Sequence, residues 1–194
     1  MNSTVSIVSI LLAGIFTNNM VLSRFLGICP FLGVSKKVST AVSMGGAVTL
    51  VMVLATAVTW PICTYLLIPY DLEYLQTIVF ILIIAALVQL LEIVIKRFLK
   101  SLYGAFGIYL SLITTNCAVL AITLLNFTQI YNFVQSMVNS LSAGLGFLLA
   151  MFIFSGVRVR IESSDIPKGL RGLPITLVAA ALVSLSFLGF SGLI

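Results

Sequence analysis

Two of the three cysteines in this 194-residue chain stand where a thiol could bind a metal. Cys29 is followed directly by Pro30, and Cys117 directly follows Asn116, both within apolar stretches. Thiolates suit iron–sulfur clusters, which usually need four cysteine ligands, and a thiolate pair inside a membrane is costly unless a cation balances it. The two cysteines therefore predict half of a metal site completed by a second chain. The simpler interpretation is that both are small buried hydrophobic residues.

Cys117 belongs to a short peptide that occurs twice. Thr17-Asn18-Asn19-Met20-Val21-Leu22 recurs as Thr115-Asn116-Cys117-Ala118-Val119-Leu120, about half a chain length later. The recurrence predicts an internal duplication, with one repeat at about 1–98 and the other at about 99–194 of a single membrane domain. We expect Asn18, Asn19 and Asn116 to cap half-helices and hold the cysteine-bearing loops. Bridging of neighbouring helices by these amides is the alternative.

The composition places these residues in a membrane protein. Hydrophobic residues make up 61% of the chain and charged residues 8%, against about 25% charged in soluble domains. The absence of histidine excludes His-ligated haem, imidazole zinc sites and Ser-His or Cys-His catalysis. The N-terminus has no basic region, so no cleavable signal peptide is expected.

The pattern of apolar stretches predicts an all-α integral membrane protein with six transmembrane helices, at about 5–23, 40–67, 74–95, 102–125, 133–157 and 174–192. All ten basic residues fall in loops one, three and five: Arg24, Lys36, Lys37, Lys96, Arg97, Lys100, Arg158, Arg160, Lys168 and Arg171. These loops should be cytoplasmic and both termini outside. The net charge of +5 then reflects topology and not nucleic-acid binding.

Three spans per half make the two repeats inverted relative to each other. Inverted repeats often place a site near the bilayer midplane on interrupted helices, so we expect spans one and four to be interrupted there. Cys29 should lie on irregular backbone, because a residue before proline is pushed away from helical angles. The N-termini of half-helices would direct partial positive charge at a thiolate centre.

Two further residues have alternative interpretations. Glu92 is the only acid within a predicted span, and an ion pair with Lys96, one helical turn later, is the simpler explanation. A role in a cation pathway is the alternative. Cys63 has no counterpart in the other half, and packing is its expected role.

The residue patterns leave three classes of protein open. An electron carrier would use the cysteines as metal ligands. A secondary transporter would bind a small solute between the repeats, as inverted three-helix repeats and midplane asparagines allow. A purely structural membrane subunit would contain inert cysteines. The sequence has no Gly-rich loop of nucleotide-binding type, so nicotinamide or flavin chemistry would belong to partner chains.

Three segments resemble the family of the A-type membrane component of the bacterial Rnf complex. They are FLGICPFLGVSKK at 25–37, LITTNCAVL at 112–120 and FLGFSG at 187–192, and the resemblance covers nearly the whole chain. The sister family is the E-type component of the sodium-translocating NADH:quinone reductase. Pro30 directly after Cys29, together with a short second loop, favours the Rnf family.

This resemblance implies a function. The Rnf complex is an ion-translocating ferredoxin:NAD oxidoreductase of the bacterial cytoplasmic membrane, coupled to Na⁺ or H⁺ transport. Its A-type component pairs with a homologous E-type component of opposite topology, and two cysteines from each would hold one [2Fe–2S] cluster inside the membrane. By motif match, Cys29 and Cys117 would be the ligands here. Other subunits would carry iron–sulfur clusters and flavins, so this chain alone would contain no complete active site.

Overall fold

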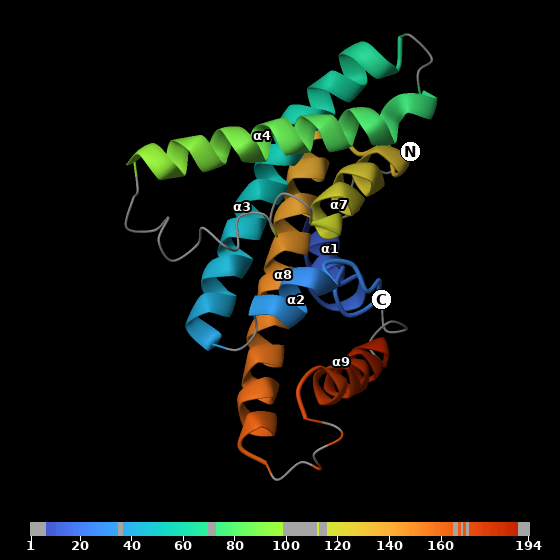
Figure 1. Ribbon diagram of the computed structural model, residues 1–194. Helices are drawn as coiled ribbons and strands as arrows, with labels where there is room; N and C mark the ends of the chain where they lie inside the picture. The colour runs from blue at the N-terminus through green and yellow to red at the C-terminus, as the bar shows by residue number, and fades with distance from the viewer. Residues whose placement is uncertain are drawn as a thin grey trace.

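The computed structural model describes residues 7–34, 37–69, 73–98, 112, 116–164, 167, 169 and 171–189 (Figure 1). This part of the chain is helical and contains no strand. Its elements are α1 (Ile7–Leu12), the π-helix η1 (Ala13–Thr17), α2 (Ile28–Val34), α3 (Val38–Ile62), the π-helix η2 (Cys63–Leu67), the 3₁₀-helix η3 (Glu73–Leu75), α4 (Gln76–Phe98), α7 (Cys117–Thr128), α8 (Phe133–Glu162) and α9 (Leu173–Leu188).

The helices α3 and α8 pack against each other along much of their lengths and form the centre of the molecule (Figure 1). Glycines allow this approach: a Cβ on Gly45 would lie 3.1 Å from the Cα of Leu148, and one on Gly144 would lie 2.9 Å from the Cα of Thr49. Small residues let membrane helices approach closely and gain van der Waals contact. The fold therefore fixes one helix of the first half directly against one of the second.

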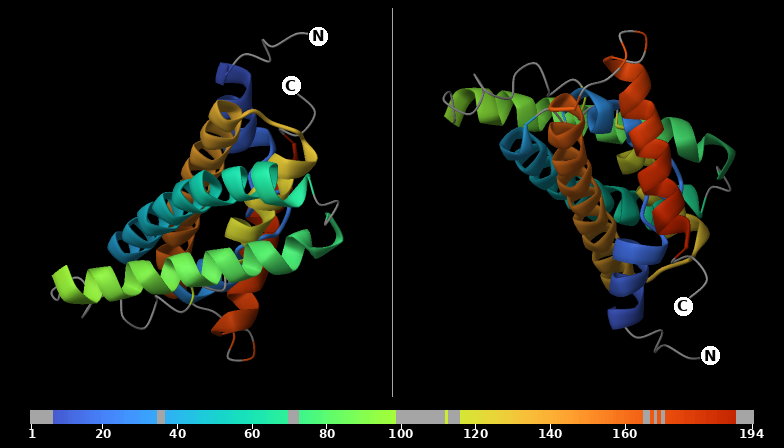
Figure 2. Two further views of the ribbon diagram at one scale, coloured as in Figure 1. Left: turned by 90° about the horizontal axis from the view of Figure 1, so that it is seen from above. Right: turned by 90° about the horizontal axis from the view of Figure 1, so that it is seen from below.

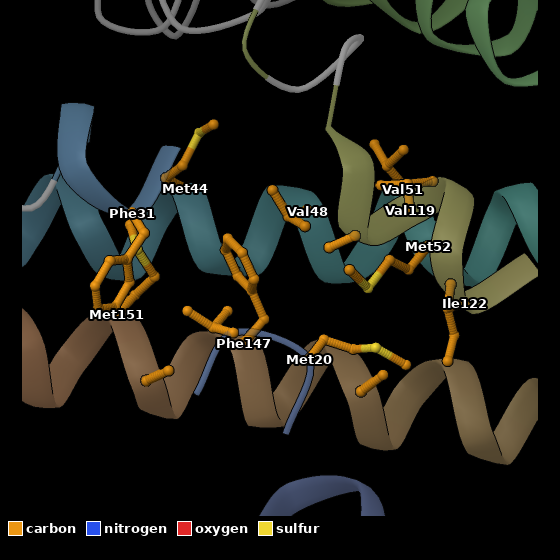
Figure 3. Packing of buried hydrophobic residues seen from close by; sticks show 14 of the residues in the cluster. Met20, Phe31, Met44, Val48, Val51, Met52, Val119, Ile122, Phe147 and Met151 are labelled. Carbon is orange, nitrogen blue, oxygen red and sulfur yellow. The ribbon is translucent and has the colours of Figure 1, made fainter. Parts of the chain in front are cut away.

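A large apolar core fills the space between α3, α7 and α8 (Figure 3). Val48 and Met52 of α3 and Phe147 and Met151 of α8 belong to this core, and all four side chains are fully buried. Phe31 of α2 stacks on Phe154 of α8, with ring centroids 4.1 Å apart. This contact fixes the short helix that carries Cys29 onto the central pair.

Within the described part of the chain, three helices are long and apolar enough to cross a membrane: Val38–Leu67, Gln76–Val94 and Phe133–Ile161. They correspond to the second, third and fifth predicted spans. The sixth corresponds to the shorter α9, and the described part of the fourth is Leu112 with α7. The first part of the predicted fourth span, 102–111, lies outside the described residues, as do Lys36, Lys100 and Lys168. A multi-pass helical membrane protein is therefore confirmed, while the six-span count and the inverted repeats stay predictions.

Helix α4 lies across α3 and α7 at the edge of the molecule (Figures 1 and 2). Gln76, Phe80, Ile84 and Val88 recur every fourth residue and form its buried stripe. Most of its other large apolar side chains are exposed, among them Leu82 at 67%. A helix with one narrow buried stripe and an otherwise apolar surface suits contact with lipid or another membrane chain.

The first predicted span stops being helical early. η1 ends at Thr17, and the chain then makes turns until α2 begins at Ile28. The backbone takes positive φ at Phe25 (56°) and Gly27 (84°). Cys29 lies in the first turn of α2, so the expectation of irregular backbone at this cysteine was wrong. Pro30 is tolerated there because the first turn of a helix has no internal partner for its N–H groups.

Candidate metal centre

Cys117 is placed by an asparagine cap. It is the first residue of α7, and the Oδ1 atom of Asn116 accepts a hydrogen bond of 3.1 Å from the backbone N–H of Ala118. Asn116 is 5% exposed. A cap of this kind satisfies a backbone donor at the start of a helix and fixes where the helix begins. The sequence predicted this capping interaction, and the cap sets the position of the thiol.

Asn19 has the equivalent role in the first half. Its Oδ1 accepts from the backbone N–H groups of Val21 at 3.1 Å and Leu22 at 3.4 Å. Its Nδ2 donates to the carbonyl oxygens of Ile15 at 3.2 Å and Gly146 at 2.8 Å. The residue is fully buried. Asn19 therefore holds the turn that follows η1 and attaches it to α8.

Asn18 differs from the other two asparagines. It is exposed at the end of η1, where its backbone N–H donates to the carbonyl oxygen of Ala13 at 2.6 Å. The sequence alignment of the repeats pairs Asn18 with Asn116, whereas the side-chain hydrogen bonds pair Asn19 with Asn116. The structural equivalence is therefore displaced by one residue from the sequence match.

The two cysteine-bearing segments meet at Gly27. Its backbone N–H donates to the Sγ of Cys117 at 2.9 Å. Because consecutive Cα atoms are about 3.8 Å apart, the Cα atoms of Gly27 and Cys29 are at most about 7.6 Å apart. Both of these cysteines are exposed, whereas Cys63 is buried. The structure thus brings together the two segments that carry Cys29 and Cys117, whereas Cys63 packs in a separate cluster.

Gly27 is a residue that the sequence reasoning did not single out. Its φ of +84° favours glycine, and a Cβ there would lie 2.9 Å from the Cε2 of Phe147 and 3.4 Å from the Oδ1 of Asn116. No local pattern reveals this close approach, because it depends on residues far away along the chain. The only signal was a glycine two residues before the first candidate ligand.

The donor groups around Cys117 suit an anionic sulfur centre. Besides the Gly27 N–H, the Nδ2 of Asn116 is buried and has no hydrogen-bond partner among the residues that the structure describes. An unpaired buried amide costs about 1–3 kcal/mol, so this donor is available to a ligand held by the thiols. Among the described residues no group of three Cys, Asp or Glu could hold a metal. The described residues therefore fit half of a cluster site.

Glu92 is half-buried on the face of α4 that also carries Ile84 and Val88. Lys96, one turn later, is exposed. The role of Glu92 in a cation pathway stays a prediction.

Arg24 was predicted to lie at the same end of the molecule as the other basic residues, and this prediction was wrong. Arg24 lines a cavity of about 80 Å³ with residues of the fourth loop, including Gln129 and Tyr131, and with Asn139 of α8. Arg158, whose Nη1 donates to the carbonyl oxygen of Leu32 at 2.7 Å, lies 19 residues farther along α8, or about 28 Å. The physical cause is the hydrogen bond from the Nδ2 of Asn19 to the carbonyl oxygen of Gly146. This bond holds the chain against α8, so that the chain turns back there before it has crossed the membrane.

The fold defines a multi-pass helical membrane protein, and Cys29 and Cys117 are exposed cysteines in it. The family described as "Rnf-Nqr subunit, membrane protein" matches residues 7–194, and the chain belongs to this family. This confirms the resemblance inferred from the sequence.

Named relatives align along nearly their whole lengths. The A-type component of the Na⁺-translocating ferredoxin:NAD⁺ oxidoreductase complex of Acetobacterium woodii is 57% identical over 188 residues, covering 97% of this chain and 98% of the relative. The A-type component of the ion-translocating oxidoreductase complex of Syntrophotalea carbinolica is 51% identical, covering 95% and 96%. That of Serratia proteamaculans is also 51% identical, covering 93% of each chain.

Proposed function

We propose that this chain is the A-type membrane component of an ion-translocating ferredoxin:NAD oxidoreductase of the Rnf type. Its family, its relatives' names and its apolar helices support this assignment. The chain acts as one subunit of a redox-driven translocase in the bacterial cytoplasmic membrane. Subunits bearing iron–sulfur clusters and flavins complete the electron path, since this chain has no nucleotide-binding motif of its own.

One observation carries the site proposal: the Gly27 N–H donates to the Sγ of Cys117, two residues before the exposed Cys29. We assign Cys29 and Cys117 as this chain's ligands to a [2Fe–2S] cluster. The other two ligands come from a homologous membrane subunit of opposite topology that covers the exposed thiols. When bound, such a cluster accepts and releases one electron, which permits transfer through the membrane interior.

The surrounding residues stabilise negative charge at the thiols. The Gly27 N–H donates to the Sγ of Cys117, the buried Nδ2 of Asn116 is available to donate to a bound cluster, and the start of α7 contributes partial positive charge. Asn19 keeps the first-half turn against α8, which holds Gly27 in reach of Cys117. Asn18 supports the end of η1.

Coupling to Na⁺ or H⁺ follows from electrostatics. Negative charge added at the thiol pair is expensive in a low-dielectric interior and is stabilised by an approaching cation. Electron transfer and cation uptake are thereby linked. Glu92 is the candidate acid for the cation route, since α4 packs against both α3 and α7.

For the topology, we propose six spans as two inverted three-helix repeats, with spans one and four interrupted near the midplane and both termini outside. The equivalent bonding of Asn19 and Asn116 supports the repeats. The clustering of the remaining basic residues in loops one, three and five supports the orientation.

Electron paramagnetic resonance of the purified reduced complex tests the site. We expect Cys29→Ser and Cys117→Ser each to remove one [2Fe–2S] signal and ferredoxin-dependent NAD reduction. Cys63→Ser is the matched control, because Cys63 is buried within a separate small cluster, and we expect this variant to keep the signal. An unchanged signal in both ligand variants would contradict the assignment.

A further inference from the structure

Two neighbouring cavities lie where the turn between α7 and α8 meets the rest of the molecule. The larger has a volume of about 460 Å³ and is bounded by α3, η2, α4 and α7, and the smaller has a volume of about 80 Å³. Tyr131 lines both. In the proposed topology this end is at the outer side of the membrane. Neither candidate cluster ligand lines either cavity.

The larger cavity suits an apolar ligand. Cys63, Phe80 and Phe127 line it and belong to one small apolar cluster. Its polar wall residues Thr59 and Asn126 are only 3% and 4% exposed, and they use their donors within the protein. A polar group entering this cavity would lose its hydrogen bonds to water without replacing them. The volume falls within the range of about 300–1,000 Å³ that is typical of mostly apolar small-molecule pockets.

The mouth of the larger cavity carries exposed apolar side chains. Ile130 is 90% exposed and Ile68 is 51% exposed, and both are lining residues. Ile130 also has a φ of 51°, which a β-branched residue rarely adopts. The turn therefore keeps an isoleucine exposed in spite of backbone strain. Lipid tails are as apolar as such side chains, so a mouth of this kind suits an opening toward the bilayer.

Aromatic residues indicate the depth at which the two cavities meet. Trp60 lines the larger cavity, and its Nε1 donates to the carbonyl oxygen of Tyr131 at 3.1 Å. Tryptophan and tyrosine are enriched at the level of the lipid headgroups. Thr56 and Thr123 also line the cavity, about one helical turn deeper than Trp60 and Phe127. The larger cavity therefore extends from headgroup level toward the hydrocarbon interior.

The smaller cavity provides a positive charge beside this boundary. Arg24 lines it together with the amide side chains of Asn18, Gln129 and Asn139, and its described lining contains no carboxylate. Among the described residues no acid pairs with the guanidinium of Arg24. A guanidinium binds phosphate through paired N–H donors. Because Arg24 lies at the end of the molecule opposite Arg158, the positive-inside rule does not account for its charge.

We infer that the two cavities together bind one anionic phospholipid of the outer leaflet, with its phosphate at Arg24 and part of one acyl chain in the larger cavity. Two links bring these parts within reach of one molecule. Tyr131 lines both cavities, and Asn139 of the smaller one donates to the Oδ1 of Asn126 in the larger one at 2.7 Å. A basic pocket between membrane helices is a known form of headgroup site.

Other ligands fit only part of this arrangement. Inorganic phosphate would occupy the smaller cavity and leave the apolar one unused. A neutral hydrocarbon would occupy the larger cavity and leave Arg24 without an anion. A zwitterionic lipid would bring an ammonium group, for which the described linings hold no carboxylate. An amphipathic anion uses both cavities.

The test is photo-crosslinking of the purified complex in phosphatidylethanolamine vesicles that contain a small fraction of phosphatidylglycerol with a diazirine near the end of one acyl chain. We expect label at the lining residues Thr123 and Phe127, measured relative to the label on the exposed face of α4. Arg24→Gln should lower this labelling about tenfold, because the charge-assisted hydrogen bonds to phosphate are lost. Arg171→Gln, at an exposed residue before α9, is the matched control and should leave it unchanged.

Thr64→Trp tests the acyl-chain part of the site. Thr64 is half-buried and lines the larger cavity, so an indole there should fill the space and lower the labelling while Arg24 is intact. An excess of inorganic phosphate should not displace the probe, and phosphatidylethanolamine carrying the same diazirine should label less. The [2Fe–2S] signal, recorded on the same samples, should be unchanged in all of these variants.

Three results would overturn the inference. They are equal labelling in the Arg24→Gln and Arg171→Gln complexes, displacement of the probe by inorganic phosphate, and equal labelling by the phosphatidylethanolamine probe. Each of these results rejects the lipid site and leaves the proposed function standing, because the proposed function is tested by the signal in the cysteine variants.

Discussion

The turn after η1 and the start of α7 are built by the same asparagine chemistry but lead to different structures. In each, a buried asparagine accepts a hydrogen bond from the backbone N–H two residues later. After Asn116 the chain enters a helix at once, and Cys117 is its first residue. After Asn19 the chain turns for several residues, and Cys29 comes only in the next helix, α2.

The difference lies in how each asparagine uses its amide nitrogen. The Nδ2 of Asn19 donates to carbonyl oxygens on η1 and α8, so this side chain fixes the turn after η1 to α8. The Nδ2 of Asn116 has no hydrogen-bond partner within the described part of the chain. Of the two asparagines, Asn19 thus fixes the backbone, and Asn116 leaves a donor for a ligand.

The largest effect should come from Gly27, where the two regions meet. Gly27→Val places a β-branched side chain at positive φ against Phe147, and we expect a loss of about 3 kcal/mol or more in stability together with the [2Fe–2S] signal. Thermal unfolding of the detergent-solubilised complex measures the loss. Gly46→Val is the control, since nothing lies within 4 Å of a Cβ there. Equal melting temperatures for the two variants would contradict the close contact.

Asn19→Ala should be the next most damaging change. It leaves the carbonyl oxygen of Gly146 and the turn N–H groups without their buried partner, at a cost of about 2 kcal/mol. Asn18→Ala, at an exposed neighbour, should change the melting temperature little. Equal destabilisation by the two variants would show that the buried hydrogen bonds of Asn19 do not fix the turn to α8.

Asn116→Ser should separate capping from donation. Serine keeps a cap acceptor, so stability should change by less than about 1 kcal/mol, but it removes the free Nδ2. We expect the midpoint potential at this site to fall by roughly 60 mV, the shift that a tenfold preference produces in a one-electron couple. Redox titration followed by electron paramagnetic resonance measures it. An unchanged potential would mean that the amide does not donate to the sulfur centre.

The sequence predicted the features that depend on local composition. Long apolar stretches identified α3, α4 and α8, and an asparagine before Cys117 predicted the cap. The same reasoning failed where distant contacts decide the structure. Arg24 was assigned to the wrong end because the Asn19–Gly146 bond is invisible in a charge count.

Two other features could not be predicted from a local sequence pattern. The importance of Gly27 follows from its approach to Asn116 and Phe147, which a linear motif does not encode. A cavity of about 460 Å³ is lined by residues of α3, η2 and α7, among others, that show no common spacing along the chain. In both cases the information lies in how distant segments pack.

The glycine contacts between α3 and α8 constrain how the molecule can move. Gly45 and Gly144 bring one helix from each half to backbone distance, and shifting these helices apart would open a void in the core. The two halves consequently cannot swing as independent rigid bodies about the membrane centre. Any conformational change therefore has to involve the parts that are attached to the central pair of helices α3 and α8, namely the turn between η1 and α2 and the peripheral helices α4 and α9.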